Sequence, residues 1–350
     1  MQHQAINGSL IPISGIAPAR CRGRDHIRRL PQSSWHAARA RYDSIAPSFF
    51  PPEIGRSPGL QSRMLPHGTI AINPVKEHGI GSGQIIRRKE DGSFEYHRDD
   101  LTIEEPLEIR IGHKTIATTM RTPGHDEELA AGFLVSEGIL RKRDQVGGFS
   151  RPAGARNREN IVTIHLANGV KVKFASAKRF GTISSSCGIC GKQSIAAIRQ
   201  NFPPIVSAKD IRIEIATLVS LPPLLRKLQS EFARTGGIHA AGIFDRSGQP
   251  GVVREDIGRH NAVDKAIGRA FLEGQLPLHR HILVVSGRAS FEIMQKALSA
   301  GIPIVASVSA PSTLAMEFAR QSNQTLIGFL RPPSFNVYSH IERIALGSAQ

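Results

Sequence analysis

Three short apolar runs decide the fold: residues 281–286 read HILVVS, residues 302–308 read IPIVASV and residues 325–330 read TLIGFL. Each run is too short for an ordinary helix and resembles a strand that is buried on both faces of a sheet. Helical patterns lie between the runs, at residues 291–300 and 312–320. Strands that alternate with helices predict an α/β fold, in which helices cover both faces of the sheet.

The part of the chain before these runs is expected to be smaller and rich in strands. Residues 106–112 alternate apolar and polar side chains, and residues 113–120 continue after a turn, so the two form a predicted hairpin. Residues 122–128 then open a predicted helix, because three acids occupy its first turn, where the helix dipole favours negative charge, and Leu129, Phe133 and Leu134 give it an apolar stripe.

The loops and boundaries follow from composition. Residues 160–166 and 169–175 predict a second hairpin around an Asn-Gly turn, and residues 141–159 predict an exposed loop. Four segments are expected along the chain: a basic, disordered extension (1–67), a smaller β-rich part with one helix (68–180), an α/β core (181–345) and a tail (346–350).

Composition and charge exclude several classes of protein. The chain is 40% hydrophobic and 21% charged, as soluble globular proteins are, and three cysteines are too few for a disulfide scaffold. No run approaches the roughly 18 apolar residues of a membrane span, and no secretion signal is evident, so we expect a cytoplasmic protein. The net charge of +16 favours phosphate-bearing partners, whereas 5% aromatic residues argue against single-stranded nucleic acid.

The strongest chemical feature is the stretch SSSCGICGK at residues 184–192. Cys187 and Cys190 lie in a turn rich in Gly and Ser, and a predicted helix follows. Helix-opening amides and the charge of Lys192 would stabilise a thiolate and so make a nucleophilic sulfur.

Four interpretations of the cysteine pair stay open at this point. The two cysteines could be small residues in a tight turn, zinc ligands, a redox dithiol, or a sulfur carrier whose thiolate accepts sulfane sulfur as a persulfide. A zinc site needs about four ligands, and the zinc deaminases show a His-x-Glu motif followed by a Pro-Cys-x-x-Cys motif. His125 and Glu127 fit the first motif, but Ser186 replaces the proline of the second.

Polar turns follow several predicted strands. Residues 255–265 read EDIGRHNAVDK and begin a helix at residues 260–272. Arg259, His260 and Lys265 could bind phosphate there, while Asn261 could be an ordinary N-cap. Residues 286–291, which contain Arg288, and residues 307–313 form two more such turns, and turns of this kind line one edge of an α/β sheet, where ligands bind.

Five stretches together resemble the FdhD family, the formate dehydrogenase accessory sulfurtransferases. They are TPGHDEELA at 122–130, SSCGICG at 185–191, GIHAA at 237–241, EDIGRHNAVDK at 255–265 and SVSAPST at 307–313. The resemblance runs from about residue 70 to residue 345. It implies a cytidine-deaminase-like α/β core without catalytic zinc, beside a smaller β-rich N-terminal part.

The resemblance also implies a function. Family members accept sulfur from a cysteine desulfurase and pass it to the molybdenum cofactor, bis-molybdopterin guanine dinucleotide, which then enters formate dehydrogenase. Cys187 matches the persulfide carrier and Cys190 its helper. Phe329, Leu330, Arg331, Pro332, Pro333 and Ser334 match the stretch assigned to the cofactor, and we expect its guanine nucleotides near Arg259, His260, Arg288 and Arg331. No metal of its own is expected, and family members resemble homodimers.

Two alternatives from other classes remain. A disulfide reductase would use Cys187 and Cys190 as a reversible couple, and a non-catalytic chaperone would deliver the cofactor without either cysteine.

Overall fold

The three apolar runs form the parallel middle of a six-stranded sheet in a computed structural model of the chain. They are β11 (His281–Val285), β12 (Ile304–Ser307) and β13 (Thr325–Arg331), and they pair in this order. On one side β9 (His239–Asp245) pairs antiparallel with β11, and β10 (Pro250–Asp256) pairs antiparallel with β9. On the other side β14 (Ser334–Ser339) pairs antiparallel with β13.

The structure describes residues 72–77, 79–153, 157–172, 202–206 and 211–346. The chain divides into two compact units, Met1–Pro66 and His67–Gln350, and every described residue belongs to the second. The expected extension, tail and cysteine turn therefore lie wholly or mainly outside the described residues.

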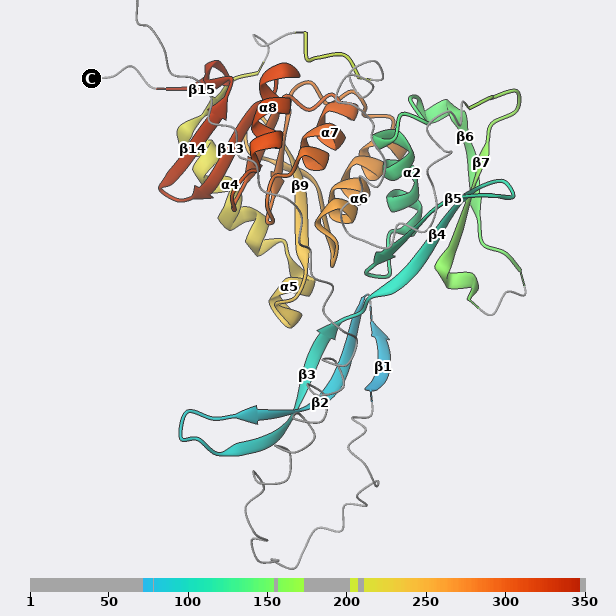
Figure 1. Cartoon of the computed structure of the whole chain (residues 1–350), viewed down its shortest axis with the longest axis vertical. Helices are drawn as coiled ribbons and strands as arrows, with labels where there is room; N and C mark the ends of the chain where they lie inside the picture. Colours follow the sequence, from blue (N-terminus) through green and yellow to red (C-terminus); the bar gives the residue numbers. More distant parts are fainter. Residues whose placement is uncertain (1–71, 78, 154–156, 173–201, 207–210, 347–350) are drawn as a thin grey trace, which may run out of the picture. The chain divides into compact units, whose positions relative to one another are not determined.

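Helices cover both faces of the six-stranded sheet, as Figure 1 shows. Alternate residues of a strand point to opposite faces, so Leu283 and Val285 pack with α6 (Arg259–Leu272), α7 (Phe291–Ser299) and α8 (Thr313–Gln321). Ile282 and Val284 pack with α4 (Ile215–Lys227) on the other face. The predicted α/β class is confirmed, and the closer likeness to a cytidine deaminase stays a prediction.

A four-stranded sheet lies beyond α6, in the order β5-β4-β7-β6. Its strands are β4 (Glu105–Ile111), β5 (Lys114–Arg121), β6 (Val146–Ser150) and β7 (Ile161–Leu166). The buried side chains of these strands and of α2 (Asp126–Ser136) join those of α6 and α7 in one continuous cluster. The predicted β4–β5 hairpin and the helix after it are confirmed.

Two expectations for this region are wrong. Residues 141–159 contain β6, in which Val146 is buried opposite Leu166 and Phe149 is partly buried against the same core. The predicted hairpin of residues 160–166 with residues 169–175 does not form, because both edges of β7 are already paired; residues 169–172 carry no strand, and residues 173–175 lie outside the described residues. Its first half, β7, pairs with β6 and β4 instead.

A third sheet joins β1 (Ile72–Glu77), β2 (Ile80–Arg88) and β3 (Phe94–Thr102). Its β3 meets α5 (Ser230–Thr235) through a hydrogen bond of 3.0 Å between the Thr102 and Thr235 hydroxyls. The short strands β8 (Ile213–Glu214) and β15 (Ile344–Ala345) pair in parallel, and turns of 3₁₀ helix occupy Arg143–Gln145, Arg158–Asn160 and Ile341–Arg343. Within the described ranges, no helix is long and apolar enough to cross a bilayer.

Helices α2 and α6 cross so closely that only glycine fits at the crossing. A Cβ on Gly132 would lie 1.9 Å from the carbonyl oxygen of Asp264, and a Cβ on Gly268 would lie 1.8 Å from that of Glu128. Backbone atoms cannot move aside as a side chain can, so any larger residue must push the helices apart. The crossing therefore fixes the four-stranded sheet against the α/β core.

We predict that Gly132→Ala or Gly268→Ala lowers the free energy of unfolding by about 2–4 kcal/mol. Urea unfolding followed by far-UV circular dichroism measures the change. Gly148→Ala is the matched control, because a Cβ there meets nothing within 4 Å. Unfolding midpoints for the Gly132 and Gly268 variants equal to that of the control would contradict the tight crossing.

Candidate functional site

The carboxyl ends of β11, β12 and β13 meet at one edge of the six-stranded sheet. Because β9 runs antiparallel to β11, its first residue, His239, lies at the same edge. The helices α6, α7 and α8 all begin there, after the turns that follow β10, β11 and β12. An edge of this kind, with loops and positive helix ends on it, is where α/β proteins bind anionic ligands.

A buried ion pair fixes the start of α6 at this edge. The Lys265 ammonium lies 2.8 Å from the Asp256 carboxylate, and both side chains are almost completely enclosed. The ammonium also donates to the carbonyl oxygen of Thr122, and the carboxylate accepts from the Thr122 amide. The pair thus joins β10, α6 and the turn before α2.

Two candidate roles within residues 255–265 are therefore wrong. Lys265 is enclosed and fully engaged, so it cannot bind phosphate. Asn261 is not the N-cap, because Gly258 holds that position and Asn261 lies inside α6. The Asn261 amide donates to the carbonyl oxygen of Met120 and to Asp256, and so closes the same network.

His239 is half-buried at the edge and faces several cations. Burial lowers the pKa of its imidazole, and the charges of Arg259, His260 and Arg288 lower it further. The imidazole is therefore neutral at neutral pH and can accept a proton or a hydrogen bond. The Nε of Arg259 is buried and has no hydrogen-bond partner among the described residues.

His260 contacts an acid rather than the open edge. Its Nε2 lies 2.8 Å from the Glu292 carboxylate and 3.1 Å from the Ser290 hydroxyl. Burial acts to raise the pKa of Glu292, but its hydrogen bond and charge interaction with His260 outweigh burial and lower the pKa. This ionised acid ties the first turn of α7 to the first turn of α6.

The stretch expected to bind the cofactor lies at the end of β13 and the start of β14. Phe329 is partly exposed and its backbone adopts a left-handed φ of 50°, while its amide donates to the Ser309 carbonyl oxygen. The Arg331 Nε donates to the Val308 carbonyl oxygen at 3.1 Å. Both residues are thereby held against the turn after β12.

The other residues of the stretch have different surroundings. Leu330 is buried in the core, while Pro332, Pro333 and Ser334 are exposed in and after the turn. Arg288 is exposed in the turn after β11. The structure thus brings Arg259, His260, Arg288 and residues 329–334 to one edge of the sheet, and whether they bind a cofactor stays a prediction.

A cavity of about 590 Å³ opens at this edge, on the side of α4 and α5. Arg226, Gln229, Phe232, His239, Ser286 and Val308 are among the residues that line it. The Gln229 side chain is 4% exposed, and its Nε2 has no hydrogen-bond partner among the described residues. The Arg226 guanidinium stacks over the Phe232 ring at 3.6 Å. The cavity can therefore offer a stacking face and an unused buried donor.

The sequence did not point to Arg226, Gln229 or Phe232. Arg226 lies in the last turn of α4, Gln229 is the N-cap of α5 and Phe232 lies on α5, and none of them belongs to a distinctive motif. The Glu255 carboxylate holds the first turn of α5, since it accepts the amides of Glu231 and Phe232 at 2.9 Å each.

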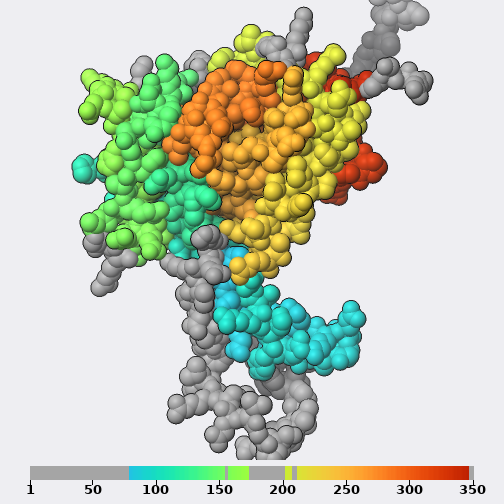
Figure 2. Space-filling view, turned by 180° about the vertical axis from the view of Figure 1, so that it is seen from behind, coloured from blue at the N-terminus to red at the C-terminus, as the bar shows by residue number. Residues whose placement is uncertain are grey.

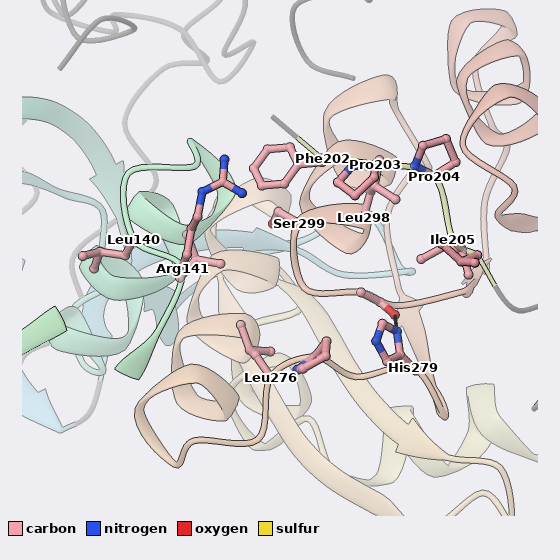
Figure 3. A pocket seen from close by; sticks show the side chains of 14 residues that line it. Leu140, Arg141, Phe202, Pro203, Pro204, Ile205, Leu276, His279, Leu298 and Ser299 are labelled. Carbon is pink, nitrogen blue, oxygen red and sulfur yellow. Dashed lines mark hydrogen bonds between the residues drawn. The ribbon is translucent and has the colours of Figure 1, made fainter. Parts of the chain in front are cut away.

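A second cavity, of about 480 Å³, lies at the opposite edge of the sheet and is shown in Figure 3. Leu276, Pro203, Pro204 and Leu298 give it an apolar wall, and Arg141 lies 5.9 Å over the Phe202 ring. None of the predicted site residues that the structure describes lines it. Cys187 and Cys190 lie outside the described residues, and among those described no group of three His, Cys, Asp or Glu side chains could hold a metal.

The comparisons with known proteins agree with one another. A model described as the FdhD/NarQ family matches residues 102–345. A sulfur carrier protein FdhD of Streptomyces avermitilis is 50% identical over 271 residues, which cover 76% of this chain and 96% of the relative. A protein of the same name from Thermoplasma volcanium is 44% identical over 277 residues, covering 77% and 98% of the two chains.

A solved structure has the same fold. It is the crystal structure of a protein from Desulfotalea psychrophila described as a formate dehydrogenase accessory protein. The TM-score is 0.59 at 22% sequence identity, and the match covers 79% of this chain and 99% of that one.

Glu231 supplies a pH-dependent prediction. Its Oε2 is buried with no hydrogen-bond partner among the described residues, and burial together with the charge of Glu255 raises its pKa from 4.5 to about 7. Between these two values the folded chain binds more protons than the unfolded chain, so stability falls as pH rises. Above a pH of about 7 the buried carboxylate of Glu231 is ionised, and the full destabilisation is present.

We therefore predict that Glu231→Gln stabilises the protein by about 1–3 kcal/mol at pH 8 and by much less near pH 5. Urea unfolding at both pH values measures the difference. Glu104→Gln is the control, since Glu104 is exposed and the same substitution there removes no buried charge. An equal effect of Glu231→Gln at the two pH values would show that the carboxyl group is not buried as described.

Proposed function

The chain belongs to the FdhD/NarQ family, and we propose that it is a sulfur carrier that serves formate dehydrogenase. The observation that carries the proposal is the 50% identity to a relative named sulfur carrier protein FdhD, nearly all of whose length is matched. In this proposal Cys187 carries the sulfur and Cys190 assists its release.

The first chemical step is an exchange between sulfur atoms. The Cys187 thiolate attacks the terminal sulfur of a persulfide on a cysteine desulfurase, and the donor cysteine leaves as a thiolate. Cys187 then holds the sulfur as a persulfide. No net oxidation occurs, because the sulfane sulfur moves between two thiolates of the same kind.

The cargo that receives the sulfur is the molybdenum cofactor, bis-molybdopterin guanine dinucleotide. Its pyrophosphates are anionic, and Arg259, Arg288 and Arg331 come to one edge of the sheet together with three helix starts. The neutral His239 and the unused donor of Gln229 add uncharged hydrogen-bonding groups beside the arginines. This combination suits a ligand that joins phosphates to a heteroaromatic base.

The sulfur-carrying step is tested by mass spectrometry of the full chain after incubation with a cysteine desulfurase, cysteine and pyridoxal phosphate. We predict a gain of one sulfur, about 32 Da, on the peptide that contains Cys187, and its removal by a reductant. Cys187→Ser abolishes the gain, whereas Cys21→Ser, the matched control, keeps it. A folded, reduced protein that gains no sulfur on either Cys187 or Cys190 would favour the chaperone alternative.

The cargo site is tested by the affinity for GDP, which represents the nucleotide part of the cofactor. We predict that replacing Arg259, Arg288 and Arg331 by Ala together weakens GDP binding at least tenfold, because charged hydrogen bonds to phosphate are lost. Isothermal titration calorimetry measures the change. Arg246→Ala is the control, since this exposed arginine lies in the β9–β10 turn at the opposite end of the sheet. Unchanged affinity in the triple variant would remove the arginines from the site.

A further inference from the structure

The outer half of the β2–β3 hairpin is a two-stranded ribbon. Strand β1 pairs with β2 only between Ile80 and Gly83, so from Gln84 onward β2 pairs with β3 alone among the described strands. Figure 2 shows this hairpin, in cyan, reaching beyond α5, in yellow. An isolated two-stranded ribbon is marginally stable in water, so its exposed face is a candidate for a partner.

One face of this ribbon carries large apolar side chains in the open. Three cross-strand pairs place their six side chains on this face, which we call the arm face: Arg88–Phe94, Ile86–Tyr96 and Gln84–Arg98. Ile86 is 61% exposed, Phe94 70% and Tyr96 74%. Apolar residues gathered at this exposure mark an interaction surface rather than scattered surface residues.

The charges of the arm face select the kind of partner. Arg88 and Arg98 stand at its two ends, and none of its six positions holds a carboxylate. The opposite face is mixed, because it carries Arg87 and Glu95 as a cross-strand pair. Aromatic residues flanked by arginines are typical of the centre and rim of a protein interface.

We propose that the arm face is the docking surface for a partner protein that presents apolar side chains between carboxylates. A second copy of this chain is a poorer occupant, since its arm face would add two more arginines and no carboxylate. A nucleic acid is a poorer occupant as well, because its backbone is a continuous row of phosphates, whereas the arm face offers two arginines around an apolar centre.

The root of the hairpin places such a partner beside the cavity at the sheet edge. The Asp100 carboxylate pairs with the Arg234 guanidinium at 2.9 Å, and Thr102 bonds to Thr235. Both contacts are made by α5, which also supplies Phe232 to the cavity wall. A protein bound to the arm face would therefore be held close to the residues proposed to bind the cargo, whatever chemistry takes place there.

The test replaces Gln84 by the photocrosslinker p-benzoylphenylalanine in the full chain and identifies crosslinked peptides by mass spectrometry after irradiation in the producing cells. Gln84 lies on the arm face, and its replacement leaves the apolar residues and both arginines in place. We expect crosslinks to a peptide of another protein that has apolar residues next to Asp or Glu. Arg88→Glu with Arg98→Glu should reduce the crosslink at least tenfold.

Exchanging the charges of the two proteins then distinguishes a specific interface from chance proximity. Substituting Lys for the partner's acids beside the crosslinked peptide should restore the crosslink to the Arg88→Glu, Arg98→Glu variant. Arg87→Glu, on the opposite face, is the matched control and should keep the crosslink. Crosslinks to this chain itself, to nucleic acid or to nothing, or crosslinks that charge reversal leaves unchanged, would overturn the proposal. The sulfur and GDP experiments do not depend on this result, so the two proposals can fail separately.

Discussion

The buried ion pair between Asp256 and Lys265 is the interaction on which the candidate site depends. Two enclosed charges are costly unless each is satisfied, and here the backbone of Thr122 bonds to both partners. The pair thereby fixes the end of β10, the start of α6 and the turn before α2 at one point. The glycine crossing of α2 and α6 continues this junction, because backbone packs on backbone there.

The sheet edge beside this junction carries both neutral groups and cations. His260 and Glu292 satisfy one another and join two helix starts, while His239 is kept neutral by burial and by neighbouring cations. Arg288 follows β11 and Arg331 ends β13, the two strands on either side of β12. The edge thus combines fixed uncharged groups with cations, which is the combination that a nucleotide-bearing anion needs, whereas the second cavity at the far edge is mainly apolar.

The sequence predicted what depends on local pattern and failed where tertiary contacts decide. The strands 281–285, 304–307 and 325–331 were predictable because their apolar runs alternate with helical patterns. Strand β6 was not, since its residues are mostly small and only Val146 is buried. Asn261 was open to an N-cap role because the sequence cannot show that Asp256 and Met120 bind its side chain. Gln229 lines the cavity because it is the N-cap of α5, and no motif in the local sequence indicates this position.

We propose that this sheet edge binds an anionic nucleotide ligand. Hydrogen–deuterium exchange of the full chain with and without GDP tests it most directly, because protection is located along the chain without any substitution. We predict slower exchange in the turns 286–291, 308–313 and 329–334. Protection confined to residues 276–279 and 298–301, at the other cavity, or no change at saturating GDP, would contradict it.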